Sequence, residues 1–157
     1  MKTSVLAVFL TISALNIVAG NASSTSLAAQ APVTPLIRAL ITVESRGNDH
    51  AIGDRHLTDK AYGCLQIRKP CLDDVNNTFG TKIRLDEVYG NRALSVWVCE
   101  RYLQRYATRK ALGREPTDED RARIWNGGPT GWKHNSTLVY WSKVQKALRG
   151  SVLAKKT

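Results

Sequence analysis

Glu44 is the residue whose position most plainly suggests chemistry. It follows an apolar helical face and lies at the expected C-terminal end of that helix. The negative end of a helix dipole and apolar neighbours both disfavour a carboxylate, so the pKa of Glu44 should be raised and its carboxyl group should be able to donate a proton. The alternative is a solvated Glu44 that is neutralised by Arg46. Position alone favours this second interpretation.

Cleavage of a glycosidic bond usually needs a second carboxylate beside the proton donor. Asp54 and Asp59 both follow Glu44 in a polar segment. Either side chain could face Glu44 across a cleft if this segment folds back, although an aspartate in such a segment is more often an ordinary turn residue. The sequence therefore leaves the identity of the second carboxylate open.

Other kinds of chemistry have little support in the sequence. The histidines His50, His56 and His134 lack the spacing of metal ligands, and we expect no metal site. The chain contains neither a phosphate-binding glycine-rich loop nor a nucleophile elbow, and nothing indicates a cofactor.

The elements that must position these residues are mostly helical. A first helix should begin at Pro35, with Thr34 as its N-cap, and end near Arg46-Gly47-Asn48. Residues 49–60 are polar and without helical periodicity, which predicts a loop or a small β-hairpin. Four further helices are expected over residues 70–78, 91–110, 118–126 and 136–148.

Two of these helices have clear end signals or a clear buried face. Thr117 and the acids that follow it form an N-terminal cap, and Asn126-Gly127-Gly128-Pro129 ends the same helix. The last helix should bury four side chains: Leu138, Trp141, Val144 and Leu148.

Composition and charge place the chain among basic globular proteins. The 157 residues are 43% hydrophobic and 23% charged, with a formal net charge of +10. This mix excludes a disordered chain, a coiled coil and a collagen-like fibre, and leaves room for one core. Such a charge concentrates a protein near anionic bacterial surfaces or nucleic acid. No nucleic-acid-binding motif is present, so we expect no nucleic-acid partner.

The N-terminus has the pattern of a secretory signal peptide. Lys2 precedes an apolar run of about 15 residues and a group of small residues. This run is shorter than the ~20 residues that span a bilayer, which argues against a membrane anchor. We predict a signal peptide at 1–22, a leader at 23–34, a catalytic domain at 35–150 and a basic tail at 151–157. The mature protein should be secreted and monomeric, without membrane insertion.

Export permits disulfide formation. Three cysteines allow at most one internal bridge, and Cys71 with Cys99 is the weakly preferred pair because Cys64 lies in a segment that resembles packed core.

Several blocks of the chain resemble the lysozyme-like superfamily, and invertebrate-type (destabilase-type) lysozymes most closely. Val43-Glu44-Ser45 and Tyr62-Gly63-Cys64-Leu65-Gln66-Ile67 resemble the "E-S … G-x-x-Q-I" signature that goose-type lysozymes and lytic transglycosylases share. The invertebrate-type features lie further along the chain, in four blocks: Arg101–Ala107, Pro116–Asp120, Ala122–Gly131 and Ser136–Val144. The likeness spans roughly residues 36–148.

The resemblance implies an α+β fold, mostly helical, in one lysozyme-like domain with a small β-hairpin. It implies hydrolysis of the β-1,4 bond between N-acetylmuramic acid and N-acetylglucosamine in peptidoglycan, with a lytic transglycosylase or a non-enzymatic wall- or nucleic-acid-binding protein as alternatives. Glu44 matches the family's proton donor and Asp54 its second carboxylate. Five residues match substrate-binding positions: Gln66, Asn126, Gly127, Gly128 and Tyr140, of which Tyr140 more often has a packing role.

The chain departs from the invertebrate-type pattern in two respects. That family is rich in cysteine, whereas this chain has three, so its stability should depend on helix packing. Trp125 replaces the histidine that precedes Asn-Gly-Gly-Pro in the family. This histidine is linked to a second, isopeptidase activity, which is therefore not expected here.

Overall fold

The computed structural model describes the backbone of residues 33–153 and the side chains of residues 33–150. The predicted signal peptide at 1–22 lies outside the described residues, as do most of the 23–34 leader and residues 154–157 of the basic tail. These assignments stay predictions.

The described chain is mostly helical with one small antiparallel sheet, as the sequence predicts. In chain order its elements are α1 (Pro35–Ser45), β1 (Ile52–Gly53), β2 (Ala61–Tyr62), α2 (Lys69–Phe79), α3 (Leu85–Val88), α4 (Arg92–Tyr106), α5 (Arg109–Leu112), α6 (Asp118–Gly127), the 3-10 turns η1 (Gly131–Lys133) and η2 (Asn135–Thr137), and α7 (Leu138–Leu153).

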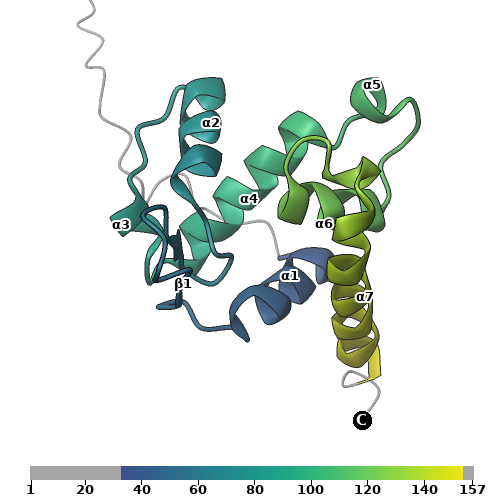
Figure 1. Ribbon diagram of the computed structural model, residues 1–157, viewed down its shortest axis with the longest axis horizontal. Coiled ribbons are helices and arrows are strands. Elements are labelled where there is room, and N and C mark those ends of the chain that lie inside the picture. The colour runs from purple at the N-terminus through teal and green to yellow at the C-terminus, as the bar shows by residue number, and fades with distance from the viewer. Residues whose placement is uncertain (1–32, 154–157) are drawn as a thin grey trace, which may run out of the picture.

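Helix α4 runs through the middle of the molecule (Figure 1). On one side α2 packs against it, and on the other side α6 does, while α1 packs along α7. The fully buried side chains of Leu40, Leu94, Val98 and Val144 come from α1, α4 and α7. One hydrophobic core therefore joins the first and last helices, which confirms a single domain.

Helix α1 has the ends that its sequence predicts. The Thr34 hydroxyl accepts a hydrogen bond from the amide of Ile37 at 3.2 Å, and Pro35 occupies the first helical position. Arg46, with φ 56°, and Gly47, with φ 85°, end the helix in left-handed conformations. Glu44 consequently lies in the last turn.

The predicted β element is a short hairpin. Ile52 pairs with Tyr62 and Gly53 pairs with Ala61 in an antiparallel register. Asp54 follows β1 directly and adopts a left-handed conformation, with φ 48°. This conformation is uncommon outside glycine but is one that aspartate tolerates better than most residues.

Several helical boundaries differ from the predicted ones. The segment 91–110 forms two helices, because the chain turns at Ala107 and Thr108 then caps α5. The apolar series at four-residue intervals, Leu94, Val98, Tyr102 and Tyr106, ends where α4 ends, since position 110 is an exposed lysine, so the predicted helix is one turn too long. Helix α3 was not predicted, since four residues are too few to show a period. The last helix begins at Leu138 after a 3-10 turn.

The structure differs from two further predictions, the burial of Leu138 and the disulfide between Cys71 and Cys99. Leu138 was expected to be buried but is 43% exposed, because it lies on the outer side of the first turn of α7. Cys64, Cys71 and Cys99 are all free thiols, so the Cys71–Cys99 bridge is not formed. Among the described residues, no helix is long and apolar enough to cross a membrane.

Candidate active site

A cleft of about 310 Å3 opens next to the C-terminal end of α1. It brings together residues from α1, the β-hairpin, α2, α4 and α6. The residues that line it are Glu44, Asp54, Ala61, Gln66, Ile67, Arg68, Cys71, Tyr102, Trp125 and Asn126. Segments that are far apart in the sequence thus place two carboxyl groups and one guanidinium group at a single cavity.

Glu44 lies in this cleft in a largely desolvated setting. Burial raises the pKa of its carboxyl group above the ordinary 4.5, and hydrogen bonds from Tyr140 and Trp125 oppose this rise without cancelling it. The hydroxyl of Tyr140 donates to Oε1 of Glu44 at 2.6 Å. Arg68 lowers the pKa and Asp54 raises it, both by smaller amounts.

Arg46 does not neutralise Glu44. Within residues 33–150 no ion pair joins the two side chains, and Arg46 is exposed at the C-cap of α1. The donors that reach the Glu44 carboxyl group are neutral, so they orient it without holding it in the charged form as strongly as a cation would. The solvated interpretation of Glu44 is therefore wrong.

Asp54 lines the same cleft and is paired with Arg68. Arg68 precedes α2 and also donates to the backbone carbonyl of Asp59 at 2.7 Å, so it ties the hairpin loop to the start of α2. Asp59 itself lines a different hollow, with Thr58 and Lys69. Of the two candidate second carboxylates, Asp54 is the one that shares the cleft with Glu44.

Two of the predicted substrate-binding residues line the cleft. Asn126 does so from the last turn of α6, and Gln66 from the turn that follows β2. The Gln66 side chain donates to the carbonyl oxygen of Gly63 at 2.9 Å. It also packs against Gly53 so closely that a side chain at position 53 would collide with its amide oxygen. Gly53 is thus needed to let Gln66 reach the cleft wall.

The other three predicted substrate-binding residues do not line the cleft. Tyr140 is buried and contacts Glu44 instead. A Cβ atom on Gly127 would lie 2.6 Å from Cγ2 of Thr137, and Gly128 adopts φ 80°. The glycines therefore serve the packing and the turn at the end of α6, and the close approach of their backbone to a sugar stays a prediction.

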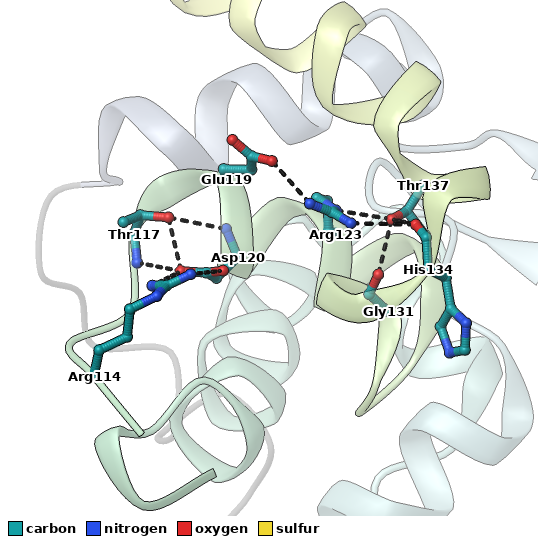
Figure 2. Close-up of polar contacts among 8 residues, drawn as sticks. All are labelled: Arg114, Thr117, Glu119, Asp120, Arg123, Gly131, His134 and Thr137. Carbon is teal, nitrogen blue, oxygen red and sulfur yellow. Dashed lines mark hydrogen bonds and ion pairs between the residues drawn. The ribbon is translucent and has the colours of Figure 1, made fainter. Parts of the chain in front are cut away.

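A hydrogen-bond network holds the start of α7 against α6 (Figure 2). Arg123 donates to Glu119 at 2.8 Å and to the hydroxyl of Thr137 at 3.0 Å. That hydroxyl donates in turn to the carbonyl of Gly131 at 2.8 Å, and Arg123 also reaches the carbonyl of His134. Because Tyr140 lies three residues after Thr137, this network helps to place its hydroxyl at Glu44.

The place of Arg68 in the cleft was not predicted from the sequence. Arg68 follows the Gln66-Ile67 pair, and nothing in its local pattern indicates a partner 14 residues earlier. Trp125, which replaces the histidine of the invertebrate-type pattern, lines the cleft next to Glu44 and packs edge-on against Tyr102, with ring centroids 5.8 Å apart. Its position directly before Asn126 on α6 was the available signal.

Cys71 lines the cleft without being a plausible nucleophile. Burial, and to a lesser extent Asp74, raises the pKa of its thiol to about 12, so the reactive thiolate is scarce at neutral pH. Over residues 33–150 no group of three or more His, Cys, Asp and Glu side chains is arranged to hold a metal ion.

No family model and no curated protein matches the sequence. The structure, in contrast, is similar to crystal structures of lysozymes. The Tapes japonica lysozyme gives a TM-score of 0.62 at 23% identity, covering 74% of this chain and 94% of its own.

Two structures that contain Meretrix lusoria lysozyme also match, one in complex with Aeromonas hydrophila PliI and the other inhibitor-bound. Their TM-scores are 0.62 and 0.61, and each has 24% identity and covers 72% of this chain and 88% of the matched chain. The likeness in fold therefore extends over most of both chains, and this protein has the lysozyme-like fold of invertebrate, bivalve lysozymes.

Proposed function

We propose that the protein is a secreted peptidoglycan hydrolase of the lysozyme type. It would cleave the β-1,4 bond between N-acetylmuramic acid and N-acetylglucosamine. The observation that carries this proposal is the pairing of a desolvated Glu44, with a raised pKa, and a second carboxylate, Asp54, in one cleft. The fold shared with lysozymes supports it.

Glu44 acts as the general acid. Its raised pKa keeps a larger fraction protonated near neutral pH, and the Tyr140 hydrogen bond to Oε1 leaves the other carboxyl oxygen to carry the proton. That proton passes to the glycosidic oxygen while the bond from this oxygen to the sugar C1 breaks, and the bonding electrons stay with the oxygen. The Glu44 carboxylate then removes a proton from the attacking water.

Asp54 supplies negative charge on the other side of the reaction. Its carboxylate stabilises the oxocarbenium-like centre that develops at C1, or it directs the water that attacks there. Arg68 holds Asp54 in the cleft through their ion pair. The positive charge of Arg68 also partly neutralises the Asp54 carboxylate, which weakens its attraction for a positive centre on the substrate.

This ion pair is the observation that favours a second candidate, a lytic transglycosylase. In such an enzyme the substrate's own acetamido group assists bond cleavage, so a neutralised Asp54 would be no handicap. Hydrolysis adds water and leaves reducing ends, whereas transglycosylation closes an anhydro-sugar ring without net addition of water. Mass spectrometry of soluble wall fragments distinguishes the products by that 18 Da difference in mass.

The test of the enzymatic proposal is the clearing of a bacterial wall suspension by the wild type and by Glu44→Gln. Loss of the general acid should reduce the rate by about 10²- to 10⁴-fold. Glu115→Gln is the matched control, because its side chain is exposed and outside the cleft. Unchanged clearing by Glu44→Gln would reject both enzymatic candidates, because each of them needs Glu44 as its acid. No clearing by the wild type would leave a protein that binds walls without cutting them.

A further inference from the structure

Acidic residues are distributed very unevenly along this chain. All 13 of them lie between Glu44 and Asp120, whereas residues 121–157 contain eight arginines and lysines and no acid. Basic residues, in contrast, occur along the whole folded region. The absence of acids, more than the presence of bases, therefore sets the last quarter of the chain apart.

Part of this acid-free segment forms the outer face of α7. Lys143, Lys146 and Arg149 are exposed there and recur at intervals of three, so they lie along one side of the helix over about 9 Å. The neighbouring helix α1 adds an exposed Arg38, and its single acid, Glu44, lies in the cleft. We call Lys143, Lys146 and Arg149 the α7 cationic face.

Nine of the 20 arginines and lysines within residues 33–150 form ion pairs with acids, and these three do not. Eight other cations in this range also lack an acidic partner, but no other helix of the described part carries three of them. A cation without an internal counter-charge keeps its full attraction for an external anion. In Figure 1, α7 lies at the edge of the molecule away from β1 and α2, which border the Asp54 side of the cleft.

We propose that the α7 cationic face binds a linear polyanion of the bacterial wall, a polymer with a phosphodiester charge in each repeat, and holds the enzyme on the wall while the cleft stays open. Over residues 138–150, the part of this helix whose side chains are described, the exposed large apolar groups are Leu138 and Val139 at its start, and no apolar stripe runs beside the cations there, which argues against a lipid surface. Residues 143–149 include no aromatic side chain that could stack on bases between the cations, which argues against nucleic acid.

The test measures binding of soluble poly(glycerol phosphate) to two charge-matched triple variants, both made in the Glu44→Gln background. Lys143→Gln/Lys146→Gln/Arg149→Gln removes the face. Lys82→Gln/Arg109→Gln/Lys110→Gln removes the same charges from exposed positions elsewhere. Because Glu44→Gln removes the proposed acid, the result does not depend on whether the protein is an enzyme.

The α7 triple variant should bind on the order of 100-fold more weakly at low salt, since each cation near an anionic surface contributes roughly a factor of five. The control variant should keep most of its affinity. Equal losses in the two variants, or no loss in either, would overturn the proposal. A loss seen with duplex DNA or anionic vesicles but not with poly(glycerol phosphate) would overturn it as well.

Folding and catalysis are separated from binding by two further measurements. Single substitutions Lys143→Gln and Lys146→Gln should each weaken binding about fivefold while leaving the thermal transition in place. With Glu44 intact, the α7 triple variant should cleave a soluble neutral oligosaccharide at the wild-type rate, because none of its changes lies in the cleft. A graded loss of binding in correctly folded variants supports the face; folded single variants with unchanged binding would refute it.

Discussion

Glu44 and Asp120 both have carboxyl groups that are partly or fully shielded from solvent, and their pKa values shift in opposite directions. Burial tends to raise the pKa in both cases. At Asp120, hydrogen bonds from Arg114 and Thr117 outweigh burial and lower the pKa to about 2. At Glu44 the nearest donors are the neutral groups of Tyr140 and Trp125, and the pKa stays raised.

The geometry explains the difference. Arg114 donates to both oxygens of Asp120, at 2.6 and 2.9 Å, and Thr117 adds its backbone amide at 2.8 Å (Figure 2). Asp120 also lies in the first turn of α6, where the helix dipole favours negative charge, whereas Glu44 lies in the last turn of α1, where it does not. The fold thus uses one carboxyl group as a structural anion and keeps the other available as an acid.

The largest effect on stability should come from Asp120→Ala. This substitution removes the reciprocal capping of α6 and leaves Thr117 without its partner, at a cost of about 1 to 2 kcal/mol in the free energy of unfolding. Urea denaturation at pH 7 measures it. Asp118→Ala is the control on the same turn. Asp118 is exposed and its ion pair with Arg121 is long, at 3.8 Å, so its loss should cost less than about 0.5 kcal/mol.

The contribution of Asp120 to the free energy of unfolding should depend on pH in a defined direction. Because the folded pKa of Asp120 lies below the ordinary 3.8, its contribution is complete above that value and is lost as the pH falls towards about 2. The stability difference between wild type and Asp120→Ala should shrink over this range. A difference that stays constant down to pH 2 would show that the Asp120 charge contributes nothing.

Tyr140→Phe should widen the difference between the pKa values of Glu44 and Asp120. The hydroxyl stabilises the charged carboxyl group, so its loss should raise the pKa of Glu44 further and move the alkaline limb of kcat/KM to higher pH. Loss of orientation should lower kcat by roughly tenfold. Tyr89→Phe, at an exposed tyrosine, serves as the control. An alkaline limb that moves to lower pH would contradict the assigned role.

Asp54→Asn should move the pKa of Glu44 in the opposite direction and by less. The Asp54 charge raises that pKa, and its removal also frees Arg68, whose charge lowers it. NMR titration of the Glu44 side-chain carboxyl group should show a small downward shift. Wall clearing at the wild-type rate would remove Asp54 from the mechanism and transfer weight to the transglycosylase candidate.

The smallest effect should be a gain in stability on Glu44→Gln. A raised folded pKa means that burial of the charged form opposes folding as the pH rises above the ordinary 4.5. The variant should therefore unfold a few degrees above the wild type at pH 8 and at nearly the same temperature at pH 4. Thermal transitions at the two pH values test this; equal transitions at pH 8 would mean that Glu44 carries no buried charge.

The sequence alone was sufficient for features that depend on neighbouring residues. The ends of α1 follow from Thr34-Pro35 and Arg46-Gly47, and the start of α6 follows from Thr117, since capping is decided within a few residues. The same local signals placed Glu44 in the last turn of its helix, but position alone favoured a solvated carboxylate, and the burial that raises its pKa came from the tertiary structure.

Only the tertiary structure decided which groups meet Glu44. Tyr140 is 96 residues away, and the choice between Asp54 and Asp59 depended on Arg68 and on how the hairpin folds back. It also decided that Gly127 packs against Thr137 instead of lining the cleft. Local propensities act over a few residues, whereas the partners of a desolvated carboxyl group are set by the packing of helices from both ends of the chain.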